Sequence, residues 1–284
     1  MDTRDRYESD FDSEWCPGCG NFGILEAMKD ALASLNIAPH GVLMVSGIGQ
    51  AAKTPHFLRC NTFHSLHGRA LPAATGAKLA NRDLTIIVNS GDGDCYGEGG
   101  NHFIHAIRRN VDLTLLVHNN GVYGLTKGQA SPTSTVGMVT RIQHHGVTSD
   151  PFNPLAVALT LGCGFVARGF SGDREHLSHL IQAGIEHRGF SLIDIFQPCV
   201  SFNKINTFVW YKDRVERLDP LQERAPDDRQ RALTLAEQTG DRLPIGIFYQ
   251  EEKPTFMDRM PGLAAPPLVD RHYDAGRLQA VLDS

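Results

Sequence analysis

Two oxygen-bearing side chains follow two apolar stretches of the chain in a pattern that suits a divalent cation. Asp92 comes just after the apolar run 84–90, and Asn120 lies just beyond the apolar run 111–118. If both runs are neighbouring parallel strands, their carboxyl ends meet at one edge of a sheet, where ligands bind in α/β proteins. Mg²⁺ takes oxygen ligands, usually a few protein groups together with the phosphates of a bound molecule. The predicted magnesium ligands are therefore Asp92, Asn120 and the main-chain carbonyl of Val122.

The residues around Asp92 suit a diphosphate. Gly91 and Gly93 flank it and Asp94 follows, and glycine lets a backbone approach a phosphate closely. Free N–H groups at the start of a following helix favour the same anion. Tyr96 stands where a dinucleotide fingerprint needs its last glycine, and no G-K-[ST] follows as in a P-loop. A turn without a ligand is the plain alternative, and the paired asparagines after the next apolar run argue against it.

Two cysteines form a C-x-x-C turn near the start of the chain. Cys16 and Cys19 enclose a Pro-Gly pair, and such a turn can give two thiolates to one iron–sulfur cluster. A zinc site would need a second pair or histidines at fixed spacing, and the sequence has no second C-x-x-C. A thioredoxin-like redox pair is a further interpretation, which the flanking residues do not favour.

The elements that must position these residues alternate between strand and helix. The apolar runs predict strands at 41–46, 84–90, 111–118 and 191–196, and the periodicity predicts helices at 24–35, 67–81, 101–109, 154–161, 175–187 and 228–238. This order indicates an α/β fold with a mostly parallel sheet flanked by helices. Segments 91–100 and 140–149 are predicted loops.

Domain organisation is predicted from where the pattern weakens. Residues 1–200 form the predicted main domain, which begins with an exposed arm to about Glu14. Residues 201–284 hold Pro, Arg, Asp and Gln in irregular order and are predicted to be a C-terminal extension that packs on a partner subunit.

Composition excludes several classes of function. The net charge of −5 gives no electrostatic footprint for nucleic acid and no basic patch for a membrane surface. The polar, acidic start does not resemble a signal peptide, and no apolar run reaches the roughly 18 residues of a membrane span. Six cysteines with a close pair, in a chain without a leader, predict a cytoplasmic protein with metal or redox chemistry.

Five motifs occur in a fixed order along the chain. They are Cys16–Gly20 (CPGCG), Gly47–Gly49 (GIG), His67–Pro72 (HGRALP), Gly91–Asn101 (GDGDCYGEGGN) and Gly121–Gln129 (GVYGLTKGQ). The pair GDG and Asn-Asn resembles the thiamine-diphosphate motif of transketolase-like, decarboxylase and oxoacid oxidoreductase families. All five together resemble the β subunit of 2-oxoacid:ferredoxin oxidoreductases over roughly residues 12–205.

The resemblance implies thiamine diphosphate, Mg²⁺ and one [4Fe–4S] cluster as cofactors. Cys16, Cys19 and the distant Cys199 match the cluster ligands of this family. A cysteine follows G-I-G in many relatives, but Gln50 stands there in this chain. Cys60 is the favoured fourth ligand and Cys95 the other candidate; if neither serves, the cluster has a ligand other than cysteine or is absent.

The resemblance also implies site residues and a substrate. The predicted cofactor contacts are Gly91, Asp92, Gly93, Asp94, Asn120, Val122, Gly124 and Leu125. His67 resembles an active-site histidine near the thiamine ring, and orienting the backbone is its equally plausible structural role. Lys127 lies in an L-T-K string that resembles the 2-oxoglutarate type, in which a fixed cation would meet the second carboxylate of the substrate; contact with cofactor phosphate or solvent is the alternative.

The implied activity is oxidative decarboxylation of 2-oxoglutarate with coenzyme A to succinyl-CoA and CO₂, with electrons passed through the cluster to ferredoxin. The reverse carboxylation is equally open. An α subunit is expected to complete the active site with a glutamate, in an (αβ)₂ assembly. Two other hypotheses remain: a non-redox thiamine decarboxylase or synthase subunit without a cluster, and a non-catalytic binding module with a structural metal at Cys16 and Cys19.

Overall fold

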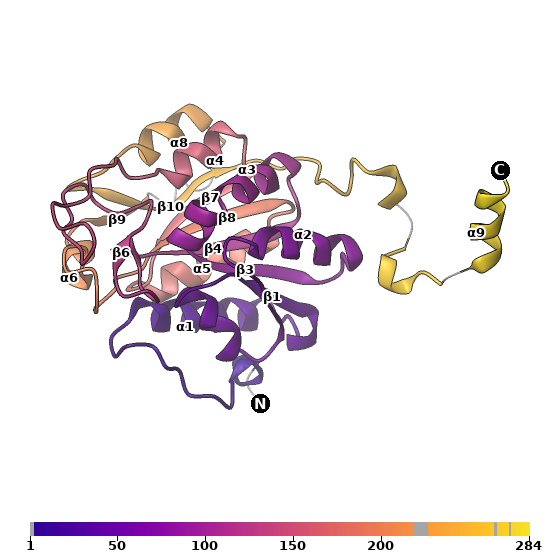
Figure 1. Ribbon diagram of the computed structural model, residues 1–284, viewed down its shortest axis with the longest axis horizontal. Helices are drawn as coiled ribbons and strands as arrows, with labels where there is room; N and C mark the ends of the chain where they lie inside the picture. The colour runs from indigo at the N-terminus through magenta and orange to yellow at the C-terminus, as the bar shows by residue number, and fades with distance from the viewer. Residues whose placement is uncertain (1–2, 219–226, 264–265, 273) are drawn as a thin grey trace.

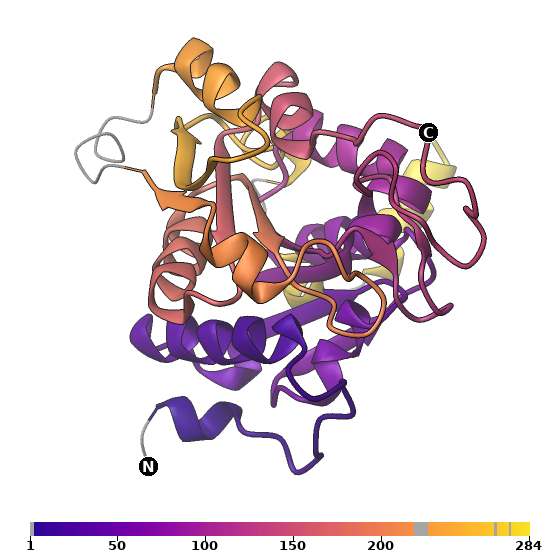
Figure 2. The same ribbon diagram turned by 90° about the vertical axis from the view of Figure 1, so that its left-hand side faces the viewer.

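An eight-stranded sheet with helices on both faces forms the body of the protein (Figures 1 and 2). The computed structural model describes residues 3–218, 227–263, 266–272 and 274–284. Along the sheet the strands are β2 (Asn61–His64), β1 (Val42–Ser46), β3 (Thr85–Gly91), β4 (Leu113–Asn119), β8 (Phe190–Phe196), β7 (Phe165–Phe170), β10 (Leu243–Gln250) and β9 (Val215–Arg217). The first six are mutually parallel, and β10 runs antiparallel to β7. The predicted α/β fold with a mostly parallel sheet is confirmed.

Helices cover both faces because the strands are apolar on both sides. One core cluster joins the sheet to α1 (Gly20–Ser34) and α5 (Arg174–Glu186). The other joins it to α2 (Ala70–Ala80), α3 (Gly100–Arg109), α4 (Pro154–Thr160) and α8 (Arg229–Ala236). Leu115 and Leu116 are neighbours in β4 and both are fully buried. Leu115 belongs to the cluster with α2, α3, α4 and α8, whereas Leu116 belongs to the cluster with α1 and α5. Strands buried on both faces read as continuous apolar runs, which is why β1, β3, β4 and β8 were predictable.

Two elements differ from expectation near the site. The segment 91–100, predicted as a loop, contains the π-helical turn η4 (Gly93–Glu98), which leads into α3. Strand β7 was not predicted because its run FVARGF holds a charged residue and a glycine. Its Arg168 is nevertheless 6% exposed, since its guanidinium lies over the rings of Phe196 and Phe248.

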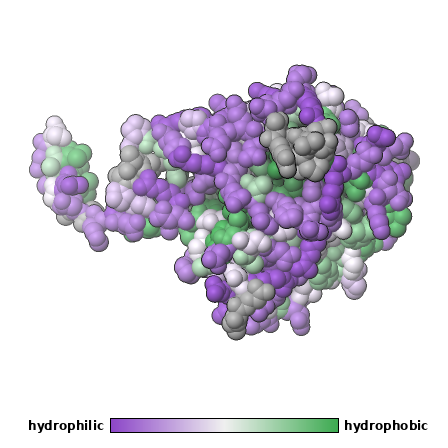
Figure 3. Space-filling view, turned by 180° about the vertical axis from the view of Figure 1, so that it is seen from behind, coloured by the Kyte–Doolittle hydropathy of each residue, from purple (hydrophilic) through white to green (hydrophobic). Residues whose placement is uncertain are grey.

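The predicted division at residue 200 does not follow the sheet. Strands β9 and β10 extend the same sheet, and α8 packs on it beside α4. Beyond β10 the chain still contacts the body, where the Phe256 N–H donates to the Asn110 carbonyl at 3.1 Å and Arg188 pairs with Asp258 at 2.5 Å. It ends in α9 (Ala275–Leu282), which stands clear of the body in Figures 1 and 3. Leu278, Val281 and Leu282 of α9 are exposed. Contact of residues 201–284 with a partner subunit stays a prediction, and α9 is the described element of this segment that stands clear of the body.

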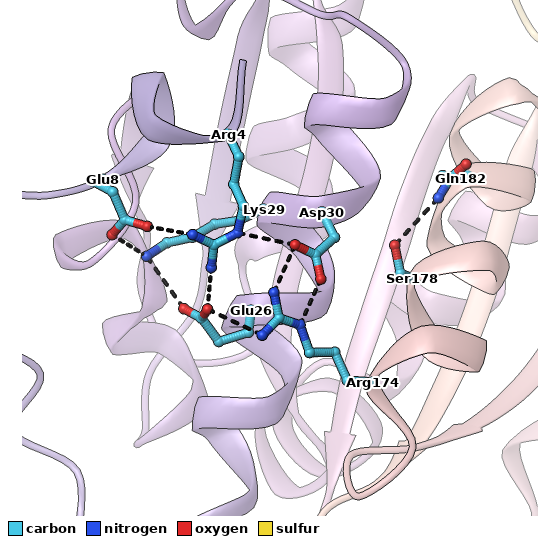
Figure 4. Close-up of polar contacts among 8 residues, drawn as sticks. All are labelled: Arg4, Glu8, Glu26, Lys29, Asp30, Arg174, Ser178 and Gln182. Carbon is cyan, nitrogen blue, oxygen red and sulfur yellow. Dashed lines mark hydrogen bonds and ion pairs between the residues drawn. The ribbon is translucent and has the colours of Figure 1, made fainter. Parts of the chain in front are cut away.

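The N-terminal segment is bound to the body, whereas an exposed arm was expected. Tyr7, in the short helix η1 (Arg4–Tyr7), is fully buried, and its hydroxyl donates to the Ile37 carbonyl at 2.6 Å. Figure 4 shows a network of ion pairs that ties this segment to α1 and α5. Its members are Arg4, Glu8, Glu26, Lys29, Asp30 and Arg174.

Among the described residues no helix is long and apolar enough to cross a bilayer.

Candidate functional site

The carboxyl ends of four adjacent parallel strands gather the predicted site residues at one edge of the sheet. Gly47–Gln50 follows β1, Asp92 follows β3, Asn120 follows β4, and Gln197 follows β8. Strands β3 and β4 pair directly, with Gly91 opposite His118, so their next residues emerge side by side. This edge is where α/β folds bind ligands.

The Asp92 carboxylate is held at this edge by two hydroxyl groups. It is 1% exposed, and its Oδ2 atom accepts hydrogen bonds from Ser131 Oγ at 2.5 Å and Thr133 Oγ1 at 2.6 Å. Burial raises the pKa of Asp92, while the two hydroxyls and the backbone N–H of Asn120 act in the opposite direction. The bond to the Asn120 backbone and the shared cleft place Asp92 and Asn120 close together, although 28 positions separate them in the sequence.

A second layer of polar side chains lies behind Asp92. Thr133 Oγ1 is also 2.8 Å from the Asn119 amide oxygen, and the Asn119 amide nitrogen donates to both oxygens of Asp194 at 3.2 Å. Asp194 is fully buried and accepts from Tyr96 Oη at 2.8 Å. Burial raises the pKa of Asp194, and the Arg168 guanidinium, 3.9 Å away, opposes that shift. This network fixes the rotamers of the residues that hold the Asp92 carboxylate, as outer partners do at metal sites.

Asp94 lies at the wall of the cleft and organises the strand ends. Its Oδ1 accepts from His67 Nδ1 at 2.6 Å, from the Gly68 N–H at 2.7 Å and from the Ile48 N–H at 3.1 Å. Its Oδ2 accepts from Ser90 Oγ at 2.5 Å. In this structure the Asp94 carboxylate orients His67, and contact of Asp94 with the cofactor stays a prediction.

One cleft at this edge brings together all eight predicted cofactor residues. Its walls include Gly91, Asp92, Gly93, Asp94, Asn120, Val122, Gly124 and Leu125, as well as His67 and Gln50. A methyl group at Gly91 would meet nothing and would project into open space, whereas one at Gly93 would collide with the Tyr123 ring. The absence of a side chain at Gly91 therefore keeps the cleft open. At Gly93, where a phosphate contact was predicted, the absence of a side chain makes room for the Tyr123 ring.

A second pocket contains three of the four predicted cluster ligands. Cys16, Cys19 and Cys199 line it, and Gln50, Asn120 and Gly124 belong to both pockets. Burial raises the pKa of the Cys19 thiol to about 11, and the neighbouring Cys199 and Cys16 act in the same direction. The three sulfurs therefore lie near one another, directly beside the cleft that holds Asp92.

Gln197 links the two pockets. It is 1% exposed; its Oε1 accepts from Asn120 Nδ2 at 2.8 Å, and its Nε2 donates to Cys19 Sγ at 3.5 Å and to the Pro198 carbonyl at 2.9 Å. Ser201 Oγ lies 3.1 Å from Cys16 Sγ. Both residues thus contact the cysteines of this pocket, and hydrogen bonds to sulfur are one means by which proteins tune iron–sulfur clusters.

The other cysteines lie elsewhere. Cys60 precedes β2 at the amino edge of the sheet and packs against the core beside Tyr7, so the structure does not bring the predicted fourth ligand to the pocket. Cys95 and Cys163 are buried in the core under the α2–α3 face. Among the described residues, no three His, Cys, Asp or Glu side chains are close enough to hold a single metal ion. A cluster of several irons separates its ligands more widely than one ion does.

Lys127 stands on the hairpin between β5 (Val122–Tyr123) and β6 (Gln129–Ala130). Its backbone is left-handed, with φ of 76°, and its side chain is exposed. Leu125 and Thr126 line the cleft, but Lys127 lies just outside its walls. In the described part of the chain its ammonium makes no ion pair or hydrogen bond, which leaves it available to a bound molecule at the rim.

Sequence reasoning missed Ser131, Thr133 and Gln197. Ser131 and Thr133 lie about 40 positions after Asp92, in a loop whose only local signal is its Ser, Thr and Pro content. Gln197 adjoins the predicted Cys199 and ends a predicted strand. That place, at the same sheet edge as Asp92, was the one signal that could have identified it.

Comparisons with known proteins agree with this geometry. A family model described as "Thiamine pyrophosphate enzyme, C-terminal TPP binding domain" matches residues 43–195, and a model of the C-terminal region of the "Pyruvate ferredoxin oxidoreductase beta subunit" matches residues 199–265. A 2-oxoacid:ferredoxin oxidoreductase subunit β from Sulfolobus sp. is 44% identical, over 95% of this chain and 94% of that protein. A 2-oxoglutarate oxidoreductase subunit KorB from Mycobacterium tuberculosis is 45% identical, over 69% of this chain and 53% of that protein.

A solved structure is similar over almost the whole chain. It is a 2-oxoglutarate:ferredoxin oxidoreductase from Magnetococcus marinus with 2-oxoglutarate, coenzyme A and succinyl-CoA bound. The TM-score is 0.91 at 38% identity, over 99% of this chain and 96% of that one. The strand-end acid and amide, the cysteine pocket beside them and these matches lead to one conclusion: the chain belongs to the β subunits of the 2-oxoacid:ferredoxin oxidoreductases, which carry the C-terminal thiamine pyrophosphate-binding domain.

Proposed function

We propose that this chain is the β subunit of a 2-oxoglutarate:ferredoxin oxidoreductase. The complex would convert 2-oxoglutarate and coenzyme A to succinyl-CoA and CO₂ and pass the electrons through a [4Fe–4S] cluster to ferredoxin; it could also run in reverse. The observation that carries the proposal is the shared wall between the Asp92 cleft and the cysteine pocket. A non-redox thiamine enzyme has no use for three cysteines beside its cofactor cleft.

The residues of the cleft fit thiamine diphosphate and Mg²⁺. Both hydroxyl donors bond Oδ2 of Asp92, and no described side chain donates to its Oδ1. The proposed Mg²⁺ ligands are therefore Asp92, the Asn120 amide oxygen and the Val122 carbonyl, a donor set of hard oxygens. When bound, thiamine diphosphate supplies the carbanion chemistry that a 2-oxoacid needs for decarboxylation.

This chain's own residues orient and sequester the reacting groups. His67 lines the cleft, is 39% exposed there, and is fixed through Nδ1 by the Asp94 carboxylate. That bond leaves Nε2 as the atom able to hold or give a proton to a bound intermediate. The buried Asp194–Asn119–Thr133 network keeps Asp92 at a fixed position beneath.

An α subunit is part of the same proposal. Thiamine enzymes need a carboxylate near the aminopyrimidine, and no glutamate is among the described residues that line the cleft. Glu98 borders it, but its carboxylate accepts from Tyr123 Oη at 3.1 Å. We therefore expect an α subunit to close the cleft and supply the glutamate, in an (αβ)₂ assembly. A cytoplasmic location fits the unpaired cysteines, which need a reducing compartment.

An anaerobic assay of the co-expressed α and β subunits tests the proposal. We expect 2-oxoglutarate and coenzyme A to reduce ferredoxin, or a one-electron dye, only when both subunits and thiamine diphosphate are present. We also expect the broad visible absorption of an iron–sulfur cluster, bleached by 2-oxoglutarate. A complex that decarboxylates without reducing an acceptor and contains no iron would instead identify a non-redox thiamine enzyme.

Substitution of Lys127 tests the proposed substrate. The Lys127→Ala variant should lower kcat/KM for 2-oxoglutarate relative to pyruvate by about 10- to 100-fold, because a hydrogen bond to a charged group contributes roughly 1.5–3 kcal/mol. Lys127→Arg keeps the cation and should retain most of the preference, and the exposed Lys212→Ala should change nothing. An unchanged ratio in Lys127→Ala would remove Lys127 from the substrate site.

A further inference from the structure

The cysteine pocket contains three thiols and one free amide. Cys16, Cys19 and Cys199 are the cysteines that line it in the described part of the chain, and Gln50 lines it with them. A four-iron cluster requires a ligand for each iron, normally a cysteine thiolate. The identity of the fourth ligand therefore depends on which group can reach the pocket.

Cys60, Cys95 and Cys163 do not line the pocket. Cys60 lies before β2, at the amino edge, whereas the pocket lies at the carboxyl edge. Cys95 is 3% exposed and faces the core beside Leu71 and Val88. The Cys163 sulfur lies 3.2 Å from the Phe165 carbonyl, also inside the core. All three thiols are thus directed to surroundings other than this pocket in the structure.

Gln50 is held at the pocket by its backbone, with its side chain free. The indole N–H of Trp15, the residue before Cys16, donates to the Gln50 carbonyl at 2.9 Å. The Gln50 side chain lies near Gly124, another residue of both pockets. Its amide has no hydrogen-bond partner among the described residues. Gln197, the other glutamine of the pocket, has both ends of its amide bonded to protein.

We infer that three thiolates, those of Cys16, Cys19 and Cys199, hold the cluster, and that Gln50 faces a fourth iron that no cysteine binds. The inference rests on the proposed function, because it assumes that this pocket holds a cluster. The unique iron has the neutral amide oxygen or solvent as its ligand. One fewer anionic ligand makes the cluster easier to reduce than its four-thiolate counterpart, since net charge is a main determinant of the potential.

The arrangement also makes the unique iron removable. When ferricyanide accepts one electron from [4Fe–4S]²⁺, the cluster can release Fe²⁺ and remain as [3Fe–4S]⁺, with its three thiolate bonds intact. A fourth thiolate would oppose this loss by holding the departing iron. The difference is visible spectroscopically and does not depend on turnover.

Mössbauer and EPR spectroscopy of the anaerobic αβ complex test this inference. In the unmodified complex we expect one iron environment distinct from the other three. Brief ferricyanide treatment should release about one iron in four and produce the EPR signal of a three-iron cluster. The Gln50→Cys variant should keep its fourth iron under the same treatment and have a lower reduction potential. Cys60→Ser should behave as the unmodified complex does, and Cys199→Ser should lose the cluster.

Each contrary result has a separate meaning. Four equivalent iron sites in the unmodified complex, or loss of the cluster in Cys60→Ser, would overturn the three-thiolate assignment and leave the proposed function intact. If Gln50→Cys does not fold, Gln50→Ala decides the case: it should retain the three-iron signal. A reconstituted complex without any iron would contradict the proposed cluster and this inference with it.

Discussion

The Asp92→Asn variant of the αβ complex should lose more than about 100-fold in affinity for Mg²⁺ and thiamine diphosphate. Replacing an outer partner of a metal ligand already costs about 10- to 100-fold, and Asp92 is the one carboxylate in the proposed ligand set. Isothermal titration of the cofactor into the complex, at fixed Mg²⁺, measures the effect. The matched control is Asp83→Asn, an exposed acid in the turn after α2. Cofactor binding that survives in Asp92→Asn would place the metal elsewhere.

The same substitution should stabilise the cofactor-free chain. Burial raises the pKa of Asp92 in the folded chain, so the folded state holds this proton more tightly than the unfolded state does. A carboxyl group whose pKa is raised by folding stabilises the folded state when it is protonated. This contribution is complete below the pKa of the unfolded state, about 3.9, and is lost as the pH rises through the pKa of the folded state. At neutral pH the charged Asp92 therefore opposes folding, and its neutral replacement should not. The melting temperature without cofactor should rise by roughly 2–4 °C for each kcal/mol gained.

The Asp92→Asn variant should therefore bind the cofactor more weakly and yet have a higher melting temperature. This combination distinguishes a carboxylate that binds a metal from one that only stabilises the fold. If Asp92 served only to receive the hydroxyls of Ser131 and Thr133, its replacement would lower the melting temperature. A melting temperature that falls in the cofactor-free variant, at pH 7, would therefore contradict the account of Asp92 as a carboxylate kept for a cation.

The His67→Gln variant should lower kcat by about 10²- to 10⁴-fold, the usual contribution of a positioned acid or base. Its effect should fall on kcat more than on cofactor affinity, because the proposed role of His67 is contact with the reacting molecule and not with the metal. Steady-state kinetics with 2-oxoglutarate, together with a cofactor titration, separate the two quantities. His40→Gln is the control: this exposed residue precedes β1, at the opposite edge of the sheet.

Asp94→Asn distinguishes catalysis by His67 from a backbone role. Asp94 accepts from His67 Nδ1 and fixes which ring nitrogen faces the cleft, so its loss should shift the pH dependence of kcat. If His67 only oriented the backbone, His67→Gln would change the melting temperature and leave kcat and its pH profile unaltered. That result would remove His67 from the reaction.

The parts of the fold that were predictable are those that follow from local pattern. Strands β3 and β4 are continuous apolar runs, and parallel strands bring their carboxyl ends together, so the meeting of Asp92 and Asn120 followed from the sequence. Strand β10 was missed because its run LPIGIFYQ contains a proline and a glycine and lies in a segment rich in charged residues. The buried Arg168 concealed β7 for a similar reason.

The parts of the site that were not predictable depend on contacts between distant residues. Nothing near Cys60 in the sequence shows that it lies at the wrong edge of the sheet, because that depends on how β2 pairs with β1. Likewise, the bond from Ser131 to Asp92 joins a loop to a strand end 39 positions earlier. Gln50 differs: its place after G-I-G signalled a departure in the sequence, and the structure shows that the described cysteines lining the pocket are Cys16, Cys19 and Cys199.

The most direct test of the central claim is a crystal structure of the αβ complex with thiamine diphosphate and Mn²⁺ in place of Mg²⁺, with the metal located by its anomalous scattering. The account predicts one Mn²⁺ at the carboxyl ends of β3 and β4, bound by Asp92, the Asn120 amide oxygen, the Val122 carbonyl and the diphosphate. A metal bound at any other position, or a diphosphate bound outside the Asp92 cleft, would contradict it.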